Sequence, residues 1–232
     1  MKISVIVPAL NEAANIAATL LRLQSSRAQG HEVIVVDGGS VDDTANIAAA
    51  LSDHVLTAPT GRARQMNVGA DRAQGVVLLF LHADTQLPDD WASVIATALK
   101  SNQHQWGRFD VKLSGSHPML RVVARLMNWR SRLTHIATGD QAIFVRRDVF
   151  VGCSGFPDIP LMEDIALSKL LKRRGAPANL RECVVTSSRQ WERRGIVKTI
   201  LMMWRLRLAY AMGADPQALY RRYYDNQNNA VS

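Results

Sequence analysis

The first hundred residues alternate between short apolar runs and segments with helical spacing. Apolar or β-branched runs cover residues 3–7, 32–37, 54–57 and 76–81, and helices are expected over 13–24, from 42 onward and within 61–72. The first helix is expected to have Asn11 as its N-cap. Runs this continuous are typical of strands buried on both faces. The βαβα order predicts an α/β fold, a mostly parallel sheet with helices on both faces.

The second half of the chain mixes strand types. Strands are expected at 106–113 and 142–146, helices at 118–133 and 162–174, with Gly175 ending the latter, and a final helix at 196–212. A chain of 232 residues with 47% hydrophobic residues fits one domain. We therefore predict a single domain, 1–232, with a first half over 1–100, a second over 101–195 and a C-terminal helical, basic segment over 196–232.

The final helix is interrupted by Lys198, Arg205 and Arg207. Its apolar stretches are shorter than the ~20 residues that a membrane span requires, so no transmembrane segment is predicted. The apolar side chains of this helix form one arc with Arg207 inside it. Packing in the core, a subunit contact such as a homodimer interface and contact with a membrane surface are the alternatives for that arc.

Positive charge is concentrated near the C-terminus. The net charge is +8, and residues 172–222 hold twelve Lys/Arg against three Asp/Glu. Such a region attracts anions, which could be a nucleotide diphosphate, a nucleic acid or an anionic membrane surface. Two distant cysteines and no zinc-type spacing argue against a disulfide framework or a zinc site. The start of the chain has no signal-peptide pattern, so a cytoplasmic location is expected, with the inner face of the membrane as an alternative position.

Polar residues follow three of the predicted strands. The segments are Pro8-Ala-Leu-Asn-Glu12, Asp37-Gly-Gly-Ser40 and His82-Ala-Asp84. Ligands of open α/β sheets collect at the carboxyl ends of the strands, so these segments are candidate binding loops. The loop after the first strand has no glycine, which excludes the G-x-G-x-x-G fingerprint of dehydrogenases, and a Walker loop is absent from the sequence.

Two acidic residues in these loops have a functional and a structural interpretation. Asp37, followed by two glycines, could contact a ribose or base, or could form an ordinary turn. Asp84 could hold Mg²⁺ or Mn²⁺ together with diphosphate oxygens, or could bond its own loop. His82 could be a second metal ligand or a hydrogen-bonded strand-end side chain.

Further candidates lie in the second half. Glu163 and Asp164 begin a predicted helix, where a carboxylate could take a proton from an acceptor hydroxyl. Arginines near residues 61–64 and 189–194 could bind phosphate through their guanidinium forks, and Trp191 could stack on a sugar or base or pack structurally.

Together these segments resemble the family-2 glycosyltransferases, which have the GT-A fold and transfer a sugar from a nucleotide diphosphate donor with inversion. Val5-Ile-Val-Pro-Ala-Leu-Asn-Glu12 is similar to the opening strand and donor loop of the family, and Val35-Val-Asp-Gly-Gly-Ser-Val-Asp-Asp-Thr44 to its second nucleotide-contacting segment. Leu79-Phe-Leu-His-Ala-Asp-Thr85 occupies the place of the metal motif, Met162-Glu-Asp-Ile-Ala-Leu167 resembles the acid pair, and the 188–195 segment is similar to the acceptor-side element.

The resemblance implies a role for each matching position. The fold would be GT-A, Rossmann-like with a mixed second half, and the activity that of a hexosyltransferase-type enzyme using Mg²⁺ or Mn²⁺. The first half would bind the nucleotide sugar, and residues 101–195 would form the acceptor and catalytic half. The implied catalytic residues are Asp164, as base, and Glu163; the metal residue is Asp84. The implied donor-binding residues are Pro8, Ala9, Asn11, Glu12, Asp37, Gly38, Arg64, Asn67, His82 and Ala83. The implied acceptor or phosphate residues are Gly139, Asp140, Gln141, Arg189, Trp191 and Arg193.

The chain also departs from the pattern of the family. His82 stands where many relatives have the first Asp of the metal motif, which leaves one carboxylate for the cation. The order Arg-Gln-Trp-Glu-Arg differs from the Gln-x-x-Arg-Trp of processive synthases, so a polymerase is not expected. A compact subgroup shares the 61–67, 139–141 and 156–164 segments and has been linked to arsenosugar biosynthesis. The acceptor is thus open between a small molecule such as an arsenosugar precursor and a lipid-linked or cell-surface glycan precursor.

Two other classes of function remain as alternatives. A sugar-phosphate nucleotidyltransferase would carry a glycine-rich, Arg-bearing loop after the first strand and a following Lys, which residues 8–12 do not contain. A non-enzymatic basic module would bind a nucleotide or nucleic acid through residues 172–222, but aromatic residues are sparse there and specific nucleic-acid binding is not expected.

Overall fold

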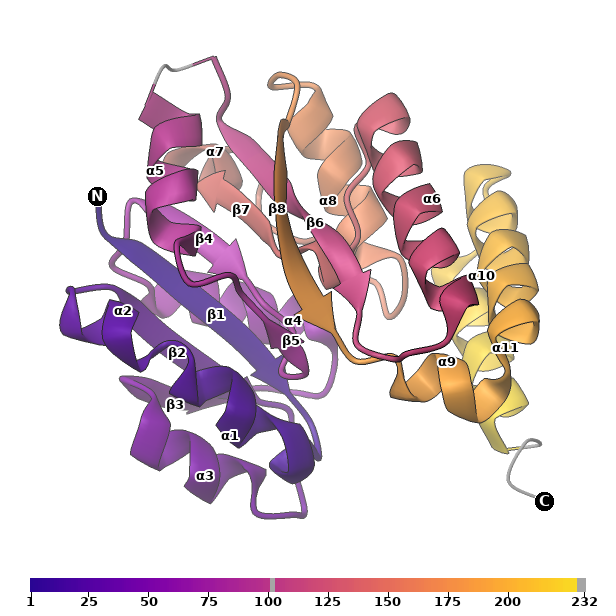
Figure 1. Ribbon diagram of the computed structural model, residues 1–232, viewed down its shortest axis with the longest axis horizontal. Helices are drawn as coiled ribbons and strands as arrows, with labels where there is room; N and C mark the ends of the chain where they lie inside the picture. The colour runs from indigo at the N-terminus through magenta and orange to yellow at the C-terminus, as the bar shows by residue number, and fades with distance from the viewer. Residues whose placement is uncertain (101–102, 229–232) are drawn as a thin grey trace.

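Figure 1 shows a computed structural model of the chain, and the structure describes residues 1–100 and 103–228. The first two residues of the predicted second half, 101 and 102, and the last residues of the predicted C-terminal segment, 229–232, lie outside the described residues.

The described residues form one eight-stranded sheet. Its strands are β1 (Ile3–Ala9), β2 (Glu32–Asp37), β3 (His54–Thr57), β4 (Val77–Phe80), β5 (Thr85–Gln86), β6 (Trp106–Leu113), β7 (Ile143–Arg146) and β8 (Ala178–Thr186). The order across the sheet is β3-β2-β1-β4-β7-β6-β8-β5. Strands β1 to β4 are parallel to one another. Strand β7 is antiparallel to β4 and to β6, β8 is parallel to β6, and β5 is antiparallel to β8. The predicted mostly parallel sheet with a mixed second half is therefore confirmed.

Helices connect these strands and extend beyond the sheet. They are α1 (Ala13–Leu21), α2 (Gln24–Ala28), α3 (Thr44–Leu51), α4 (Arg62–Arg72), α5 (Trp91–Lys100), α6 (Pro118–Thr134), α7 (Arg147–Gly152), α8 (Glu163–Lys172), α9 (Arg189–Arg194), α10 (Ile196–Ala211), α11 (Pro216–Asn228) and the short 3₁₀ helix η1 (Gly139–Gln141).

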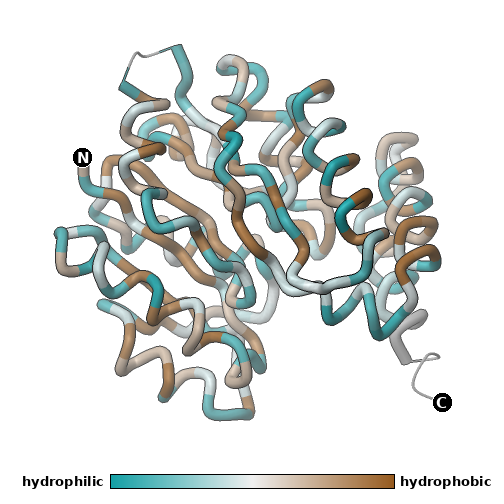
Figure 2. Tube along the Cα trace, viewed as in Figure 1, coloured by the Kyte–Doolittle hydropathy of each residue, from teal (hydrophilic) through white to brown (hydrophobic). Residues whose placement is uncertain are grey.

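Helices cover both faces of the sheet, as the βαβα pattern predicted (Figure 1). On one face, α1, α3 and α5 contribute Ile16, Leu20, Ala48, Trp91, Ile95 and Leu99 to a buried cluster. On the other face, α4, α7 and α8 contribute Ala63, Met66, Ala70, Phe150, Leu167 and Leu171. In Figure 2 the central strands are mostly hydrophobic, whereas hydrophobic and hydrophilic residues alternate along the helices. The strands are therefore buried between the two helical layers.

A third, smaller cluster attaches the C-terminal helices. Met162 and Ile165 beside and on α8 pack with Leu206 of α10 and Leu219 of α11. The final helices therefore lie against the start of α8, and not apart from the domain. Within the described residues, no helix is long and apolar enough to cross a membrane.

Several local expectations were wrong. The predicted helix over 13–24 is two helices, because α1 ends at Leu21 and α2 begins at Gln24. Asn11 is not the N-cap; that position belongs to Glu12, whose side chain makes no capping hydrogen bond, and Asn11 has a left-handed φ of 53°. Strand β8 and helix α11 were not predicted. Both have mixed polar and apolar sequences whose burial depends on β6 and on α10, respectively.

Candidate functional site

The three predicted binding loops meet at one edge of the sheet. Strand β1 pairs in parallel with both β2 and β4, so the chain leaves all three strands on the same side, after Ala9, Asp37 and Phe80. Because β7 runs antiparallel to β4 and begins opposite Phe80, the preceding helix η1 reaches the same edge. The sheet topology therefore gathers segments from both halves of the chain.

Hydrogen bonds join the first two loops to each other. The Asn11 N–H donates to Ser40 Oγ at 2.9 Å, and the Val41 N–H donates to Asn11 Oδ1 at 2.9 Å. The Glu12 N–H donates to Thr44 Oγ1 at 2.8 Å. A left-handed backbone is tolerated best by Gly, Asn and Asp, so Asn at position 11 can turn the loop and also hold its neighbour. These contacts give residues 8–12 and 37–44 one fixed shape.

Asp37 organises the second loop. Its Oδ2 accepts hydrogen bonds from the Gly39 and Ser40 N–H groups at 3.0 and 2.9 Å, and the Ser40 hydroxyl donates to Oδ1. Gly39 has a φ of 93°, which favours glycine. The side chain is only 6% exposed in this arrangement. The turn interpretation of Asp37 is thus visible in the structure, whereas the nucleotide contact stays a prediction.

Gln65 of α4 is a site residue that the sequence analysis missed. Its Nε2 donates to the Ala9 and Val36 carbonyls, each at 2.8 Å, so one buried amide ties the ends of β1 and β2 together. A Cβ added to Gly38 would lie 3.0 Å from this nitrogen, which explains the small residue there. A polar residue on the buried face of α4, four residues before the buried Gly69, was the available signal.

Arg64 and Asn67, both predicted to bind the donor, contact the loop before α8. Arg64 Nε donates to Asp158 Oδ1 at 2.8 Å, and that hydrogen bond with its ion pair raises the pKa of Arg64. Asn67 makes two bonds with Phe156: its Nδ2 donates to the carbonyl and its Oδ1 accepts from the N–H, each at 2.9 Å. In this conformation both side chains position the segment that leads into Glu163.

His82 faces helix η1. Its Nδ1 lies 3.4 Å from Asp140 Oδ1, and a Cβ on Gly139 would approach His82 Nε2 to 2.4 Å, so only glycine fits beside the ring. Burial tends to raise the pKa of Asp140, but the His82 hydrogen bond and the electrostatic effects of His82, Arg62 and Arg207 outweigh it, and the net shift is downward. Asp140 is therefore ionised at neutral pH.

The predicted acid pair sits next to η1. Asp164 Oδ2 accepts a hydrogen bond from the Gly139 N–H at 2.9 Å, and its Oδ1 accepts from the Ile165 N–H at 2.7 Å. These two donors fix the orientation of the carboxylate. The segment predicted to bind the acceptor and the predicted base are thus in direct contact, although 25 residues separate them along the chain.

Glu163 occupies a different environment. It is 6% exposed and borders a cavity of about 10 Å³ whose walls include Met66, Phe80 and Phe156. A volume of that size holds roughly one water molecule. Burial, together with the negative charge of Asp164, raises the pKa of Glu163 to about 7, although Arg62 acts in the opposite direction. The two neighbouring carboxyl groups therefore differ in environment, as acid–base pairs in enzymes often do.

The residues available for a divalent cation are few. Among the residues that the structure describes, no group of three or more His, Cys, Asp or Glu side chains is arranged to hold a metal ion. Asp84 is half-buried, and its Oδ1 lies 3.5 Å from the Thr85 hydroxyl. Mg²⁺ sites of nucleotide-dependent enzymes often use one or two carboxylates and complete the shell with substrate phosphates and water. Asp84 meets the lower limit of that requirement. Next to it, the Ala83 carbonyl accepts from the Thr19 hydroxyl at 2.7 Å, which anchors the loop on α1.

Of the remaining residues predicted to bind the acceptor or phosphate, Gln141 and Trp191 pack inside the protein, whereas Arg189 and Arg193 are exposed. Gln141, the last residue of η1, is fully buried. Its Oε1 accepts from the Thr138 N–H at 3.2 Å, and its Nε2 donates to Asn128 Oδ1 at 3.3 Å, so its side chain ties η1 to α6. Trp191 is half-buried against the core cluster, which matches its structural interpretation. Arg189 lies at the surface 3.9 Å from Glu12, and Arg193 is exposed. The start of α9 therefore lies close to the first predicted binding loop.

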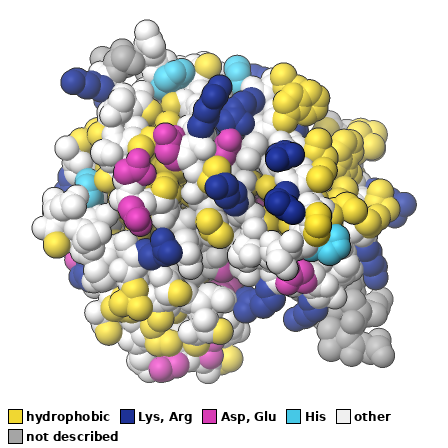
Figure 3. Space-filling view, in the orientation of Figure 1, with side chains coloured by type: hydrophobic (Ala, Val, Ile, Leu, Met, Phe, Trp, Pro, Cys, Tyr) yellow, Lys and Arg dark blue, Asp and Glu magenta, His cyan; other side chains and the backbone are white. Residues whose placement is uncertain are grey.

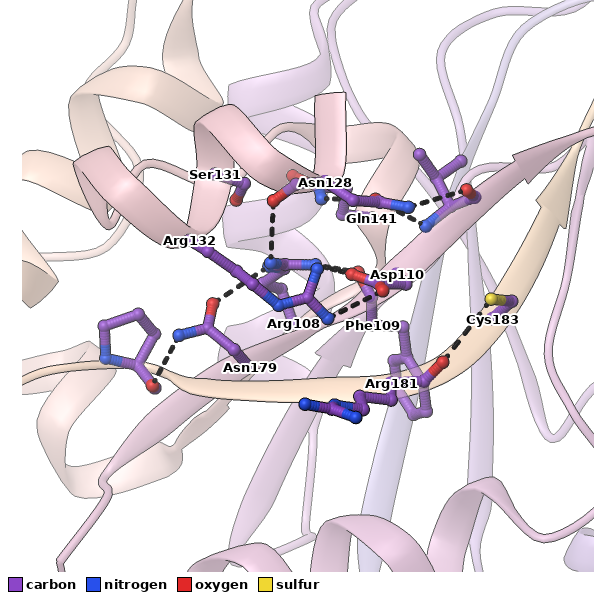
Figure 4. Close-up of polar contacts among 12 residues, drawn as sticks. Arg108, Phe109, Asp110, Asn128, Ser131, Arg132, Gln141, Asn179, Arg181 and Cys183 are labelled. Carbon is purple, nitrogen blue, oxygen red and sulfur yellow. Dashed lines mark hydrogen bonds and ion pairs between the residues drawn. The ribbon is translucent and has the colours of Figure 1, made fainter. Parts of the chain in front are cut away.

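Figure 4 shows the polar network beneath the acceptor side. Buried Arg108 contacts Asp110 and donates to the Asn179 side chain and the Asn128 carbonyl at 3.2 and 3.3 Å. Burial lowers the pKa of Arg108, and the hydrogen bond and charge of Asp110 partly offset this. Arg132 pairs with Asp110 at 2.7 Å. This network fixes α6 on β6.

Comparisons with known proteins agree with this architecture. The family model for glycosyl transferase family 2 matches residues 4–156, more than half of the chain; Glu163 and Asp164 lie beyond that match. The sequence is 29% identical over 170 residues to a PGL/p-HBAD biosynthesis glycosyltransferase of Mycobacterium bovis, with 63% of this chain and 60% of the relative covered. The chain therefore spans less than two thirds of the length of this relative.

Solved glycosyltransferase-type structures show the same fold. S. aureus TarS 1–349 in complex with UDP-GlcNAc superposes with a TM-score of 0.64 at 19% identity, over 81% of this chain and 58% of that chain. Glucosyl-3-phosphoglycerate synthase from Mycobacterium tuberculosis, in complex with Mn²⁺, UDP and glucosyl-3-phosphoglycerate, superposes with a TM-score of 0.58 at 22% identity, over 78% and 70% of the two chains. The predicted GT-A fold is confirmed, and the chain belongs to glycosyl transferase family 2.

Proposed function

We propose that the chain is an inverting glycosyltransferase that moves a sugar from a nucleotide diphosphate donor to a hydroxyl acceptor. The observation that carries the proposal is that the three strand-end loops and the Glu163–Asp164 pair lie at one edge of the sheet, where His82 contacts Asp140 and the neighbouring Gly139 contacts Asp164. Structural neighbours bound to UDP with Mn²⁺ or Mg²⁺ support a donor of this class. Residues 1–100 would bind the donor and 101–195 the acceptor.

In the proposed mechanism, Asp164 takes the proton of the acceptor hydroxyl as the hydroxyl oxygen attacks the anomeric carbon and the nucleotide diphosphate leaves. The N–H groups of Gly139 and Ile165 hold the carboxylate in one orientation, which provides the positioning that a single displacement requires. A cation held by Asp84 and the donor would neutralise charge on the departing diphosphate. Arg62, whose charge acts on Glu163 and Asp140, adds a fixed positive charge at the same edge.

A thermal-shift screen of UDP-, GDP-, dTDP- and CMP-linked sugars, each with and without Mn²⁺, tests the proposal. A donor at one hundred times its dissociation constant stabilises the native state by about 2.7 kcal/mol. We expect the sugar nucleotides of one nucleobase to raise the melting temperature of the protein, and the shift to be larger with Mn²⁺. Absence of any response would contradict the glycosyltransferase assignment. Release of pyrophosphate from a sugar phosphate and a nucleoside triphosphate would instead identify a nucleotidyltransferase.

We also propose peripheral contact with an anionic membrane, because α6 and α10 expose aligned apolar side chains. The exposed residues, which we call the apolar face, are Met119, Val122, Leu126, Trp129 and Leu133 on α6, and Val197, Leu201, Trp204 and Leu208 on α10. Their spacing of three and four residues places them on one side of each helix. Figure 3 shows hydrophobic side chains gathered on the side of the molecule where Figure 1 places these helices.

The structure changes the composition of the arc that the sequence indicated on the last helix. Ile200 and Met203 pack inward against buried clusters, and Arg207 is half-buried, so Arg207 does not interrupt the exposed stripe. Exposed Lys198 and Arg205 border the stripe instead. A second copy of the chain would bring such cations together, whereas anionic headgroups complement them.

Flotation with vesicles of phosphatidylcholine, with and without phosphatidylglycerol, tests the apolar face. We expect salt-sensitive binding to the anionic vesicles, and loss of that binding in the double variant Trp129→Ser/Trp204→Ser. Val151→Ser, which removes an equally exposed apolar side chain from α7, is the matched control. Dimerisation that the double variant abolishes, without vesicle binding by the unchanged protein, would refute the membrane assignment.

A further inference from the structure

Two arginines next to the acid pair have buried nitrogens without a protein partner. In the part of the chain that the structure describes, Nε and Nη2 of Arg130 on α6 and Nε of Arg207 on α10 are buried and make no hydrogen bond. Buried donors are nearly always paired in folded proteins, because leaving one unpaired forfeits its hydration. A buried guanidinium nitrogen without a partner therefore indicates a place where a bound group supplies the acceptor.

The polar neighbours of Arg130 on α6 all have hydrogen-bond partners, unlike Nε and Nη2 of Arg130 itself. Asn128 makes two bonds to Val111, with its Oδ1 accepting from the N–H at 2.9 Å and its Nδ2 donating to the carbonyl at 3.1 Å. Ser131 donates to the Ile136 carbonyl at 2.8 Å. Arg132 pairs with Asp110 at 2.7 Å, and both residues are labelled in Figure 4. These contacts hold this part of α6 in place, and with it the backbone position of Arg130.

The charges around Arg130 locate it at the functional site. Its guanidinium interacts electrostatically with Arg207, Asp164 and Asp140. Burial and the positive charge of Arg207 lower the pKa of Arg130 to about 10, although Asp164 opposes this. Arg130 remains charged at neutral pH, so two like charges stand close together in a partly buried position. An anion between them would relieve both the repulsion and the unmet hydrogen bonding.

The nearby carboxylates do not fill this role, because each has another partner. Asp164 accepts from Gly139 and Ile165, and Asp140 pairs with His82. The first donor loop is also not involved, since its polar atoms bond to the loop after β2. Of the two carboxylates that act on the charge of Arg130, Asp164, the proposed base, has the larger effect.

We propose that Arg130 and Arg207 form a binding site for an oxyanion, a phosphate or carboxylate group carried by the acceptor. The inference rests on the proposed glycosyltransferase function and names the class of its acceptor: a hydroxyl compound with a negatively charged group. Guanidinium forks match the oxygens of either group with paired N–H donors. Binding the anion would place the hydroxyl of the same molecule beside Asp164, which converts binding energy into orientation.

Titration with inorganic phosphate in the presence of saturating UDP and Mn²⁺, followed by calorimetry at low ionic strength, tests the site. We expect Arg130→Gln and Arg207→Gln each to weaken phosphate binding at least tenfold while UDP binding stays within about twofold. Arg125→Gln on α6 and Arg173→Gln, which remove exposed arginines, are matched controls that should retain phosphate binding. Thermal melting without ligand checks folding, and Arg130→Lys, which keeps the charge but loses the fork, serves if the glutamine variant does not fold.

The possible outcomes separate this site from the proposed function. Phosphate binding that is absent in the unchanged protein, or equally strong in both glutamine variants, overturns the anion site. Phosphate that competes with UDP, together with loss of UDP affinity in the variants, assigns the arginines to the donor diphosphate and overturns the acceptor assignment. If no nucleotide binds, the glycosyltransferase proposal fails, while the loss of phosphate binding in both variants would still establish an oxyanion site.

Discussion

Replacing Glu163 with glutamine is expected to stabilise the protein at high pH. The carboxyl group is buried beside apolar side chains and Asp164, and these raise its pKa from 4.5 to about 7. Glutamine keeps the shape of the protonated acid and removes the charge. Because one pKa unit corresponds to about 1.4 kcal/mol, ionised Glu163 destabilises the native state by about 3 kcal/mol when it is fully charged.

The sign and the pH window follow from linkage. Below about pH 4.5 the carboxyl is protonated in both the native and the unfolded state, so Glu163→Gln should leave stability unchanged. Between pH 4.5 and about 7 the unfolded state releases its proton first, and the stability of the unchanged protein falls relative to the variant. Above pH 8 the difference should reach its full value, about 6–12 °C in melting temperature for a chain of this size.

Thermal or urea unfolding of both proteins from pH 4 to pH 8.5 measures this difference. Asp71→Asn, which removes an exposed carboxyl from α4, is a control whose effect should be small at every pH. A Glu163→Gln variant that is no more stable than the unchanged protein at pH 8, or whose gain does not depend on pH, would refute the reasoning. Such a result would mean that water or Arg62 compensates the buried charge in the native state.

Three further outcomes are expected. Asp164→Asn should reduce turnover by roughly 10² or more with the donor affinity retained, as a sugar-transfer assay would measure; near-normal turnover removes it from the role of base. Asp84→Asn should abolish the extra thermal shift that Mn²⁺ gives in the presence of the donor, and an unchanged metal effect would place the cation elsewhere. Asn67→Ala should destabilise the protein by about 2 kcal/mol in urea unfolding, because it removes both bonds to Phe156; Asn46→Ala at an exposed position is the control.

Elements with continuous apolar runs were predictable from the sequence. The bounds of β2 and β3 agree with the predicted ranges, because each run is closed by residues that end a strand or start a turn. The bounds of β6 also agree, because its apolar and polar residues alternate as they do in a strand. Strand β8 was missed because its burial alternates irregularly and its place between β6 and β5 is set by pairing with distant segments. Helix α11 was missed because it is largely polar; Leu219 and the partly buried Tyr223 are the side chains that it is seen to add to a buried cluster.

The same division holds for the candidate site. Strand-end polar residues such as Asp37 and Asp84 were identifiable from local sequence, since a residue that follows a buried parallel strand reaches the ligand edge of the sheet. The signal was weaker for three other residues, Gln65, Arg130 and Arg207. Each is a polar or charged residue within an otherwise apolar helical pattern, which by itself does not indicate a role. Their partners come from other elements, so their roles depend on how the helices pack.

The sequence by itself determined the fold class, the family resemblance and the three loops at the strand ends, because periodicity, strand-ending residues and local motifs are properties of short segments. Only the tertiary structure decided what each side chain contacts. Asp37 and Asn11 turned out to shape and join the first two strand-end loops, and Asn67 to hold the segment before Glu163. Arg130 of α6 turned out to interact electrostatically with Arg207 of α10 and with Asp164. Burial, which sets the pKa of Glu163, and the meeting of segments far apart in the chain arise only once the helices pack on the sheet.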